Sequence, residues 1–219
     1  IAGNIVNTIL IIALTMLFAT PNGVGAAIYL NEYAKPGKFV SIIEFATEVL
    51  SGIPSIIFGL FGMMFFGETL GLGYSILTGS LTLILMVLPL ITRNTQEALK
   101  TVPNGYRNGA IGLGAGKWYM IRTILIPSSM PGIITGVILA IGRIVGESAA
   151  LLFTAGSAKL LPKSFLGIFD KIFQSGGTLT IQLYLSATSE GDFETAFGIA
   201  VVLLVIVLLI NIATKELTK

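Results

Sequence analysis

An arginine and a glutamate interrupt a long apolar run in the second half of the chain. The run extends from Met130 to Ala155 and contains Arg143 and Glu147, which are four residues apart. Side chains at this spacing share one face of a helix, so the sequence predicts that the guanidinium and the carboxylate pair. A guanidinium donates bidentate hydrogen bonds, which suit tetrahedral oxyanions. The pair is therefore either a structural salt bridge or a transient oxyanion site that the glutamate keeps weak.

The position of Arg143 makes its charge costly. At about 1.5 Å per residue from Met130, Arg143 lies roughly 20 Å into the run, near or just beyond the middle of a membrane span. An unpaired charge at that depth costs at least about 2.5–3.5 kcal/mol, and such residues are functional candidates by default. Arg93 is a second candidate, near the end of an earlier apolar run. Snorkelling of its guanidinium to the interface is the favoured interpretation, and the inner mouth of a pathway is the alternative.

The composition indicates that these charges sit in a membrane protein. The 219 residues are 54% hydrophobic and 11% charged, with a mean hydropathy of +0.91, whereas soluble domains carry about 25% charged residues. The net charge of +2, without a dense basic run, argues against nucleic acid as a partner. Cysteine and histidine are absent, which excludes disulfides and Cys or His metal sites, and no cofactor is expected.

Five apolar segments are long enough to span a bilayer, which needs about 17–25 residues. We therefore predict an all-α, polytopic membrane protein in which residues 1–219 form a single transmembrane domain. Pro21 and Pro54 fall inside the first two segments, where we expect kinked but continuous helices. The alternative for the first segment is a split at Pro21-Asn22-Gly23, but neither half would then be long enough to span. The five segments are Ile5–Leu30, Ser41–Phe66, Tyr74–Ile91, Met130–Ala155 and Phe193–Ala213.

The loop charges predict the orientation of these spans. Lysine and arginine gather after the first, third and fifth segments, which places those ends in the cytoplasm. The loop at residues 156–192 is the exception, because it is long, carries Lys159, Lys163 and Lys171, and is predicted to lie outside. The first residue is then also outside. Since chains usually start in the cytoplasm, we expect a further span before it, six in total.

The cytoplasmic loop at about residues 97–127 contains several glycines but does not match a nucleotide-binding loop. A Walker-type loop ending at Lys117 needs a glycine where Ile111 stands and Ser or Thr where Trp118 stands. The dinucleotide spacing that starts at Gly112 needs a glycine where Lys117 stands. Pro103 instead predicts a helix break, followed by a short helix at 106–114 whose glycines allow another protein to approach the backbone.

This loop resembles the signature of ABC importer permeases, which is E-A-A, three residues, Gly, nine residues, Ile, one residue and Leu-Pro. Here the signature reads Asn108-Gly109-Ala110, then Gly114, Ile124 and Ile126-Pro127, so Asn replaces Glu, Gly replaces Ala and Ile replaces Leu. Three further motifs make the chain similar to the A-type permease subunit of phosphate-specific importers. They are SGIPSIIFGLFG at Ser51–Gly62, LPLITRNTQEAL at Leu88–Leu99 and RIVGESAALLFTAG at Arg143–Gly156.

The resemblance implies a permease in the bacterial or archaeal inner membrane that passes phosphate inward and performs no chemistry itself. Its implied partners are ATPase subunits, a second permease subunit of the related C type, an extracytoplasmic phosphate-binding protein and lipid. Arg143, Glu147 and Arg93 are then the candidates for the substrate pathway. Another oxyanion, such as sulfate or molybdate, remains an alternative substrate, and an ATP-independent channel or secondary transporter is an alternative class. The residues implied to form a coupling helix for the ATPase are Tyr106, Asn108, Gly109, Ala110, Gly112 and Gly114.

Two further patterns concern packing. Small residues recur every fourth position in two series, Gly132, Gly136 and Ala140, then Gly142, Gly146 and Ala150, which predicts close helix contact within the subunit or with a second permease. The amphipathic segment Ser164–Gln174 is predicted to lie outside, either in the membrane interface or against a binding protein.

Overall fold

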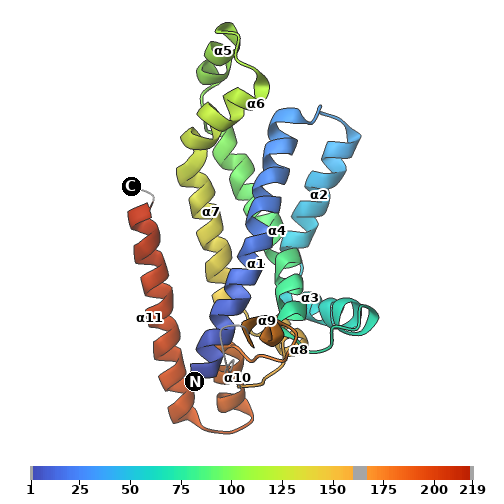
Figure 1. The fold of residues 1–219 in the computed structure, drawn as a ribbon, viewed down its shortest axis with the longest axis vertical. Coiled ribbons are helices and arrows are strands. Elements are labelled where there is room, and N and C mark those ends of the chain that lie inside the picture. Colours follow the sequence, from blue (N-terminus) through green and yellow to red (C-terminus); the bar gives the residue numbers. More distant parts are fainter. Residues whose placement is uncertain (1, 160–166, 218–219) are drawn as a thin grey trace.

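The computed structural model describes residues 2–159 and 167–217, and within them every regular element is a helix. The molecule is elongated, and its long helices run roughly along the long axis (Figure 1). Helices α5 and α6 lie at one end, which we call the α5 end. The N-terminus lies with α8, α9 and α10 at the opposite end, which we call the α10 end. The predicted all-α class is confirmed.

The first segment forms one continuous helix. Helix α1 (Ala2–Ile28) passes through Pro21 and continues into the π-helical turn η1 (Tyr29–Tyr33). Together they make a candidate span of 32 residues, Ala2–Tyr33. The prediction of a single helix through Pro21 is confirmed.

The second segment is broken rather than kinked. Helix α2 (Lys38–Gly52) is followed by α3 (Ser55–Gly62) and the π-helical segment η2 (Met63–Thr69), and the two parts are bent by 102°. Ile53 is extended (φ −72°, ψ 131°), as expected for a residue before proline, and Pro54 has no N–H to continue the helix. With 15 residues, α2 is roughly 22 Å long, shorter than the hydrocarbon core of a bilayer. The predicted continuous helix is therefore wrong here.

The third segment is longer than predicted. Helix α4 (Ile76–Lys100) begins where Ser75 accepts a hydrogen bond from the backbone N–H of Thr78. It runs more than two turns past Ile91 and ends shortly before Pro103. Arg93 and Glu97 therefore lie on a helix instead of in a loop.

The fourth segment starts earlier and ends earlier than predicted. After α5 (Asn104–Gly112), a continuous 30-residue candidate span is built from α6 (Lys117–Met120), η3 (Ile121–Leu125) and α7 (Ile126–Gly146). Glu147 is extended (φ −81°, ψ 119°), and a new helix, α8 (Ala149–Thr154), follows. The expected helix from Met130 to Ala155 is thus interrupted.

The last described elements are α9 (Gly167–Ile172), α10 (Leu179–Thr188) and α11 (Phe193–Leu217). Thr178 caps α10, and the carboxylate of Asp192 accepts hydrogen bonds from the N–H and the hydroxyl of Thr195 at the start of α11. These hydrogen bonds lower the pKa of Asp192. The first residues of the predicted amphipathic segment Ser164–Gln174 lie outside the described residues.

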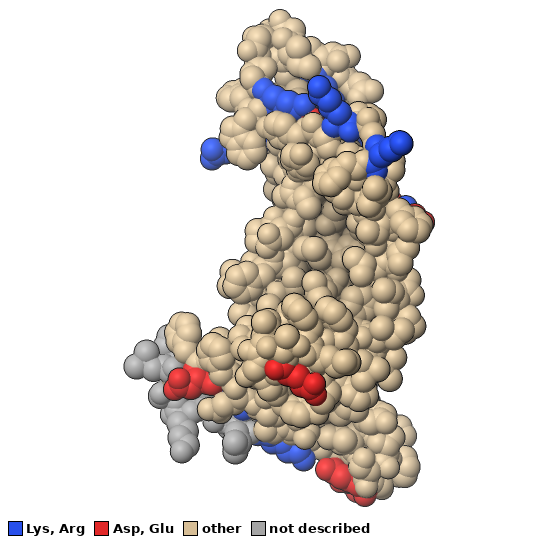
Figure 2. Space-filling view, turned by 90° about the vertical axis from the view of Figure 1, so that its right-hand side faces the viewer, with Lys and Arg blue, Asp and Glu red and all other residues tan. Residues whose placement is uncertain are grey.

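The number and placement of the helices fit a polytopic membrane protein. Four helices are long and apolar enough to span, or five if the bent pair α2–α3 counts as one. On the face shown in Figure 2, most of the lysine and arginine side chains lie toward the α5 end, and the opposite end carries acidic side chains together with basic ones. Helix α11 exposes a row of apolar side chains that suits contact with lipid: Val201, Leu204, Val205, Leu208, Leu209 and Ile212.

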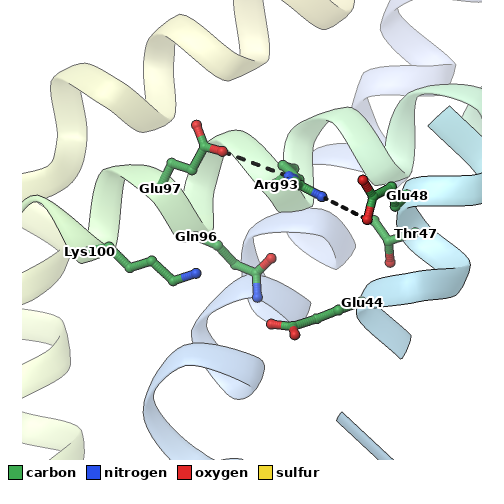
Figure 3. A pocket seen from close by; sticks show the side chains of 7 residues that line it. All are labelled: Glu44, Thr47, Glu48, Arg93, Gln96, Glu97 and Lys100. Atoms are coloured by element: carbon green, nitrogen blue, oxygen red, sulfur yellow. Dashed lines mark ion pairs between the residues drawn. The ribbon is translucent and has the colours of Figure 1, made fainter. Parts of the chain in front are cut away.

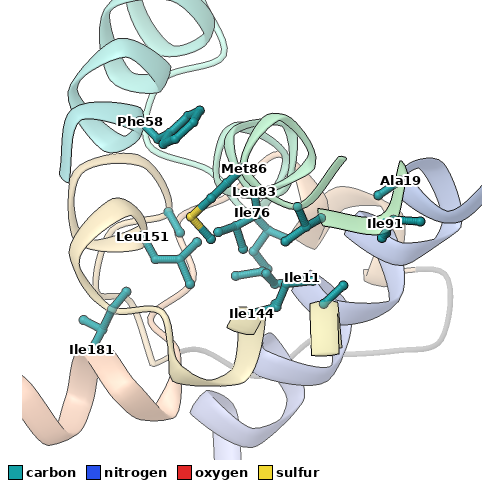
Figure 4. Close-up of a cluster of buried hydrophobic side chains, with 13 residues drawn as sticks. Ile11, Ala19, Phe58, Ile76, Leu83, Met86, Ile91, Ile144, Leu151 and Ile181 are labelled. Atoms are coloured by element: carbon teal, nitrogen blue, oxygen red, sulfur yellow. The ribbon is translucent and has the colours of Figure 1, made fainter. Parts of the chain in front are cut away.

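The core lies where α1, α4 and α7 meet near the α10 end (Figure 4). Ile11 of α1, Leu83 and Ile91 of α4, and Ile144 of α7 are buried there, and Leu151 of α8 joins them. Lipid tails are as apolar as these side chains, so close packing rather than water exclusion must hold the helices together.

Glycines provide that close packing. A Cβ at Gly132 would stand 2.6 Å from Cβ of Ala98, and one at Gly136 would stand 2.6 Å from Cβ of Asn94, so α7 touches α4 through both positions. Ala140 is also buried. The first small-residue series therefore packs inside the subunit, whereas Gly142 and Gly146 have no such neighbour within 4 Å.

We predict that Gly136→Leu destabilises the fold and that the matched variant Gly142→Leu does not. The added side chain at Gly136 must displace α4, and overpacking of this kind costs about 1–3 kcal/mol. Thermal unfolding of the purified chain in detergent checks this. Equal midpoints for the two variants would contradict the helix contact.

Candidate functional site

Helix α5 presents most of the predicted coupling residues on the surface of the α5 end. Tyr106, Asn108, Gly109 and Gly112 are exposed, and Gly114 follows the helix in an exposed turn. Ala110 is the exception, because it is buried in a small cluster with Leu99, Val102, Met120, Ile121 and Leu125. Pro103 precedes the helix as expected, and Ala115 donates a backbone hydrogen bond to the carbonyl of Ala110 as the chain turns away.

The glycines of this surface leave the backbone open. A Cβ at Gly109, Gly112 or Gly114 would meet nothing within 4 Å. Gly114 also has φ +78°, a left-handed conformation that other residues adopt at a cost. A substitution at Gly114 would therefore strain the backbone as well as change the surface. Substitutions at Gly109 and Gly112 would change the surface without that backbone strain.

Large apolar side chains surround the open glycines. Leu113 is 91% exposed, and four further side chains nearby are more than half exposed. A cluster of exposed apolar side chains of this kind is a candidate surface for contact with another protein. The four are Tyr106, Ile111, Trp118 and Tyr119.

Arg93 lies in a polar groove between α2 and α4 (Figure 3). Its guanidinium is 4.0 Å from the carboxylate of Glu48 on α2 and 3.7 Å from that of Glu97 on α4. These side chains are 52–71% exposed, so both ion pairs are loose and weak. The groove has a volume of about 230 Å³, and its lining also includes Glu44, Thr47, Gln96 and Lys100.

The groove is polar, although α4 is long and apolar enough to span a membrane. Gln96 is only 7% exposed and points into the groove, and within the described chain its amide has no hydrogen-bond partner. Contact with lipid tails would be unfavourable for the charged and amide side chains that line this groove, so either water or another protein must cover them. The snorkelling interpretation of Arg93 did not anticipate the carboxylates of α2, because nothing in the sequence places α2 beside α4.

Arg143 and Glu147 do not form the predicted pair. Glu147 turns to α8, where its carboxylate accepts a hydrogen bond of 3.0 Å from the N–H of Ala150, and its backbone carbonyl accepts one from the hydroxyl of Thr180. Arg143 is half-buried on α7 and has no ion pair or hydrogen bond in the described part of the chain. The i,i+4 geometry is lost because the helix ends at Gly146, between the arginine and the glutamate.

The two candidate arginines lie toward opposite ends of the molecule. Arg93 is seven residues from the α5 end of its helix, whereas Arg143 is three residues from the other end of α7. Counted from Ile126, Arg143 lies roughly 26 Å along α7. The structure therefore places Arg93 in a groove toward the α5 end and Arg143, which has no ion-pair partner in the described chain, near the α10 end.

Long apolar helices that carry a few charged groups, with an exposed apolar surface at one end, are typical of a helical membrane transport protein. The chain belongs to the family of binding-protein-dependent transport system inner membrane components, whose model matches residues 21–218. It is a multi-pass, inner-membrane permease subunit of the ABC transporter type.

The curated relatives refine this family. The chain is 38% identical to the "Probable ABC transporter permease protein YqgI" of Bacillus subtilis strain 168, over 96% of this chain and 75% of the relative. It is 35% identical to the phosphate transport system permease protein PstA of Mycobacterium leprae, over 90% of this chain and 63% of the relative. The chain thus spans about two thirds to three quarters of these relatives.

A solved structure shares the fold. The MetNI methionine ABC transporter, in an inward-facing conformation, matches 97% of this chain and 91% of its own with a TM-score of 0.77. At 18% identity this likeness concerns the fold alone.

Proposed function

We propose that this chain is the membrane-spanning subunit of an ATP-driven importer that carries phosphate into the cell. The observation that carries the proposal is the similarity to PstA, at 35% identity over 90% of the chain. The half-buried and unpaired guanidinium of Arg143 supports it, because a planar fork of donors suits a tetrahedral oxyanion. Another oxyanion, such as sulfate or molybdate, remains the competing substrate.

In this proposal, ATP is hydrolysed by separate subunits that dock on α5. The supporting features are the backbone left open at Gly109 and Gly112 and the exposed apolar side chains around them. Docking on α5 also requires the α5 end to face the cytoplasm, which agrees with the larger share of lysine and arginine side chains visible at that end (Figure 2). A second permease subunit and a substrate-binding protein complete the assembly.

The two arginines then act at different stages of passage. Arg143, toward the α10 end, meets the anion first. Arg93 meets it last, in a groove where Glu48 and Glu97 already compete for the guanidinium. Competition of this kind favours release, because a pathway must bind its ion weakly enough to let it leave.

The docking proposal is tested by Gly109→Leu. The leucine side chain stands where the partner must approach the backbone, so the ATPase should no longer copurify with the permease. Gly105→Leu is the matched control, since it also meets nothing within 4 Å but lies outside the proposed contact residues. Full recovery of the ATPase with Gly109→Leu would remove the coupling assignment.

The pathway proposal is tested by Arg143→Gln. Since Arg143 has no ion-pair partner in the described chain, its loss strands no other charge, and the complex should assemble normally. Phosphate uptake should fall by about 100-fold or more, as expected when a charged contact worth roughly 3 kcal/mol is lost. Arg143→Lys, which keeps the charge but not the fork, should retain part of the uptake.

Uptake by an assembled Arg143→Gln complex at the unmodified rate would show that this guanidinium does not act on the substrate.

A further inference from the structure

Arg107 joins three elements at the α5 end. It lies on α5, and its guanidinium donates to the carbonyl oxygens of Val102 (2.8 Å) and Leu99 (2.9 Å), which belong to the end of α4 and the turn after it. The same guanidinium donates to the carboxylate of Glu32 on η1, at 3.0 Å. One side chain therefore connects α5 with the ends of both α1 and α4.

This ion pair differs in kind from the others in the described chain. Its side chains are 18% and 7% exposed, and Glu32 also accepts a hydrogen bond of 2.7 Å from the amide of Asn31. The remaining described pairs are 3.7–4.0 Å long, between side chains that are about half exposed or more. A short, buried pair with additional hydrogen bonds fixes geometry in a way that exposed pairs do not.

Little else fixes α5 in place. Ala110 is its only buried residue, and alanine contributes the smallest apolar side chain of a core. A second contact from this loop reaches the same element, because the ammonium of Lys117 lies 4.9 Å from the ring centre of Tyr33 on η1. The position of α5 thus depends on the polar contacts of Arg107, and the neighbouring α6 makes a further contact with η1 through Lys117.

We infer that Arg107 and Glu32 form a positioning pair that makes α1 follow the movement of α5. The inference rests on the proposed function, in which α5 receives the ATPase. Because η1 continues directly from α1, and α1 packs along α4 through close contacts such as that of Gly23 with Ile91, a displaced η1 moves the long helices with it. Arg107 itself touches neither ATP nor phosphate, and it acts through the elements that it joins.

The pair predicts a loss of coupling that is separate from a loss of docking. In Glu32→Gln, the surface of α5 is unchanged, so the ATPase should copurify and hydrolyse ATP. The amount of phosphate moved per ATP should fall about fivefold or more, which is the lower end of typical coupling between sites. Arg107→Lys should behave similarly, because an ammonium cannot reach two carbonyls and a carboxylate with the geometry of a planar fork. Arg122→Gln is the control, since Arg122, on η3, is an exposed arginine with no ion pair among the described residues.

A distance measurement gives a second readout that does not depend on transport. The chain contains no cysteine, so Lys35→Cys after η1 and Gly105→Cys on α5 provide two unique spin-label positions. In the otherwise unmodified complex, the distance distribution should be narrow and should stay the same when ATP binds. In Glu32→Gln it should broaden, and α5 should shift relative to η1 on ATP binding.

An assembled Glu32→Gln complex with an unchanged phosphate-to-ATP ratio would overturn the inference. If that variant does not assemble, an unchanged distance distribution in the isolated chain in lipid would overturn it, and a broadened one would support it. A chain with neither substitution that fails to bind any ATPase would instead refute the proposed function.

Discussion

The hydrocarbon interior of a bilayer offers no hydrogen-bond partner to a protein, and the rest of this structure follows from that constraint. Backbone groups are paired within long helices, and side chains cap the first turns of α4, α8 and α10, where Ser75, Glu147 and Thr178 accept backbone hydrogen bonds. Helices are joined through glycines because burial from lipid gains little. Charged groups are then confined to the two ends or to places where water or another protein must meet them.

The same constraint assigns different tasks to the charged residues. Glu147 stabilises the fold, because its carboxylate satisfies the first turn of α8. Arg107 holds three elements together, and its charge is balanced by Glu32. Arg143 has neither task in the described chain, and in the proposed importer it is the candidate contact for the anion. In the proposed importer, the ATPase docks on α5 and the substrate contacts Arg143. These two sites lie near opposite ends of the packed helices α1, α4 and α7.

The sequence predicts the features that depend on local pattern. Apolar length identifies the spans, and Pro103 and the following glycines identify the exposed helix that became α5. Local pattern does not decide the structure where a single residue is compatible with two roles. Glu147 fits an i,i+4 pair with Arg143 as well as a cap for the next helix, and the structure adopts the cap. Pro54 is compatible with a kink as well as with a break, and the structure has a bend of 102° there.

Contacts between distant segments leave no local signal in the sequence. The ion pairs of Glu32 with Arg107, 75 residues apart, and of Glu48 with Arg93 could therefore not be predicted.

The central claim is that this permease moves phosphate at the expense of ATP. Its most direct test is the accumulation of labelled phosphate in liposomes that contain the complete complex, with ATP inside and the substrate-binding protein outside. The account predicts accumulation that requires ATP and is not reduced by an excess of sulfate or molybdate. Accumulation without ATP, or strong competition by sulfate or molybdate, would contradict it.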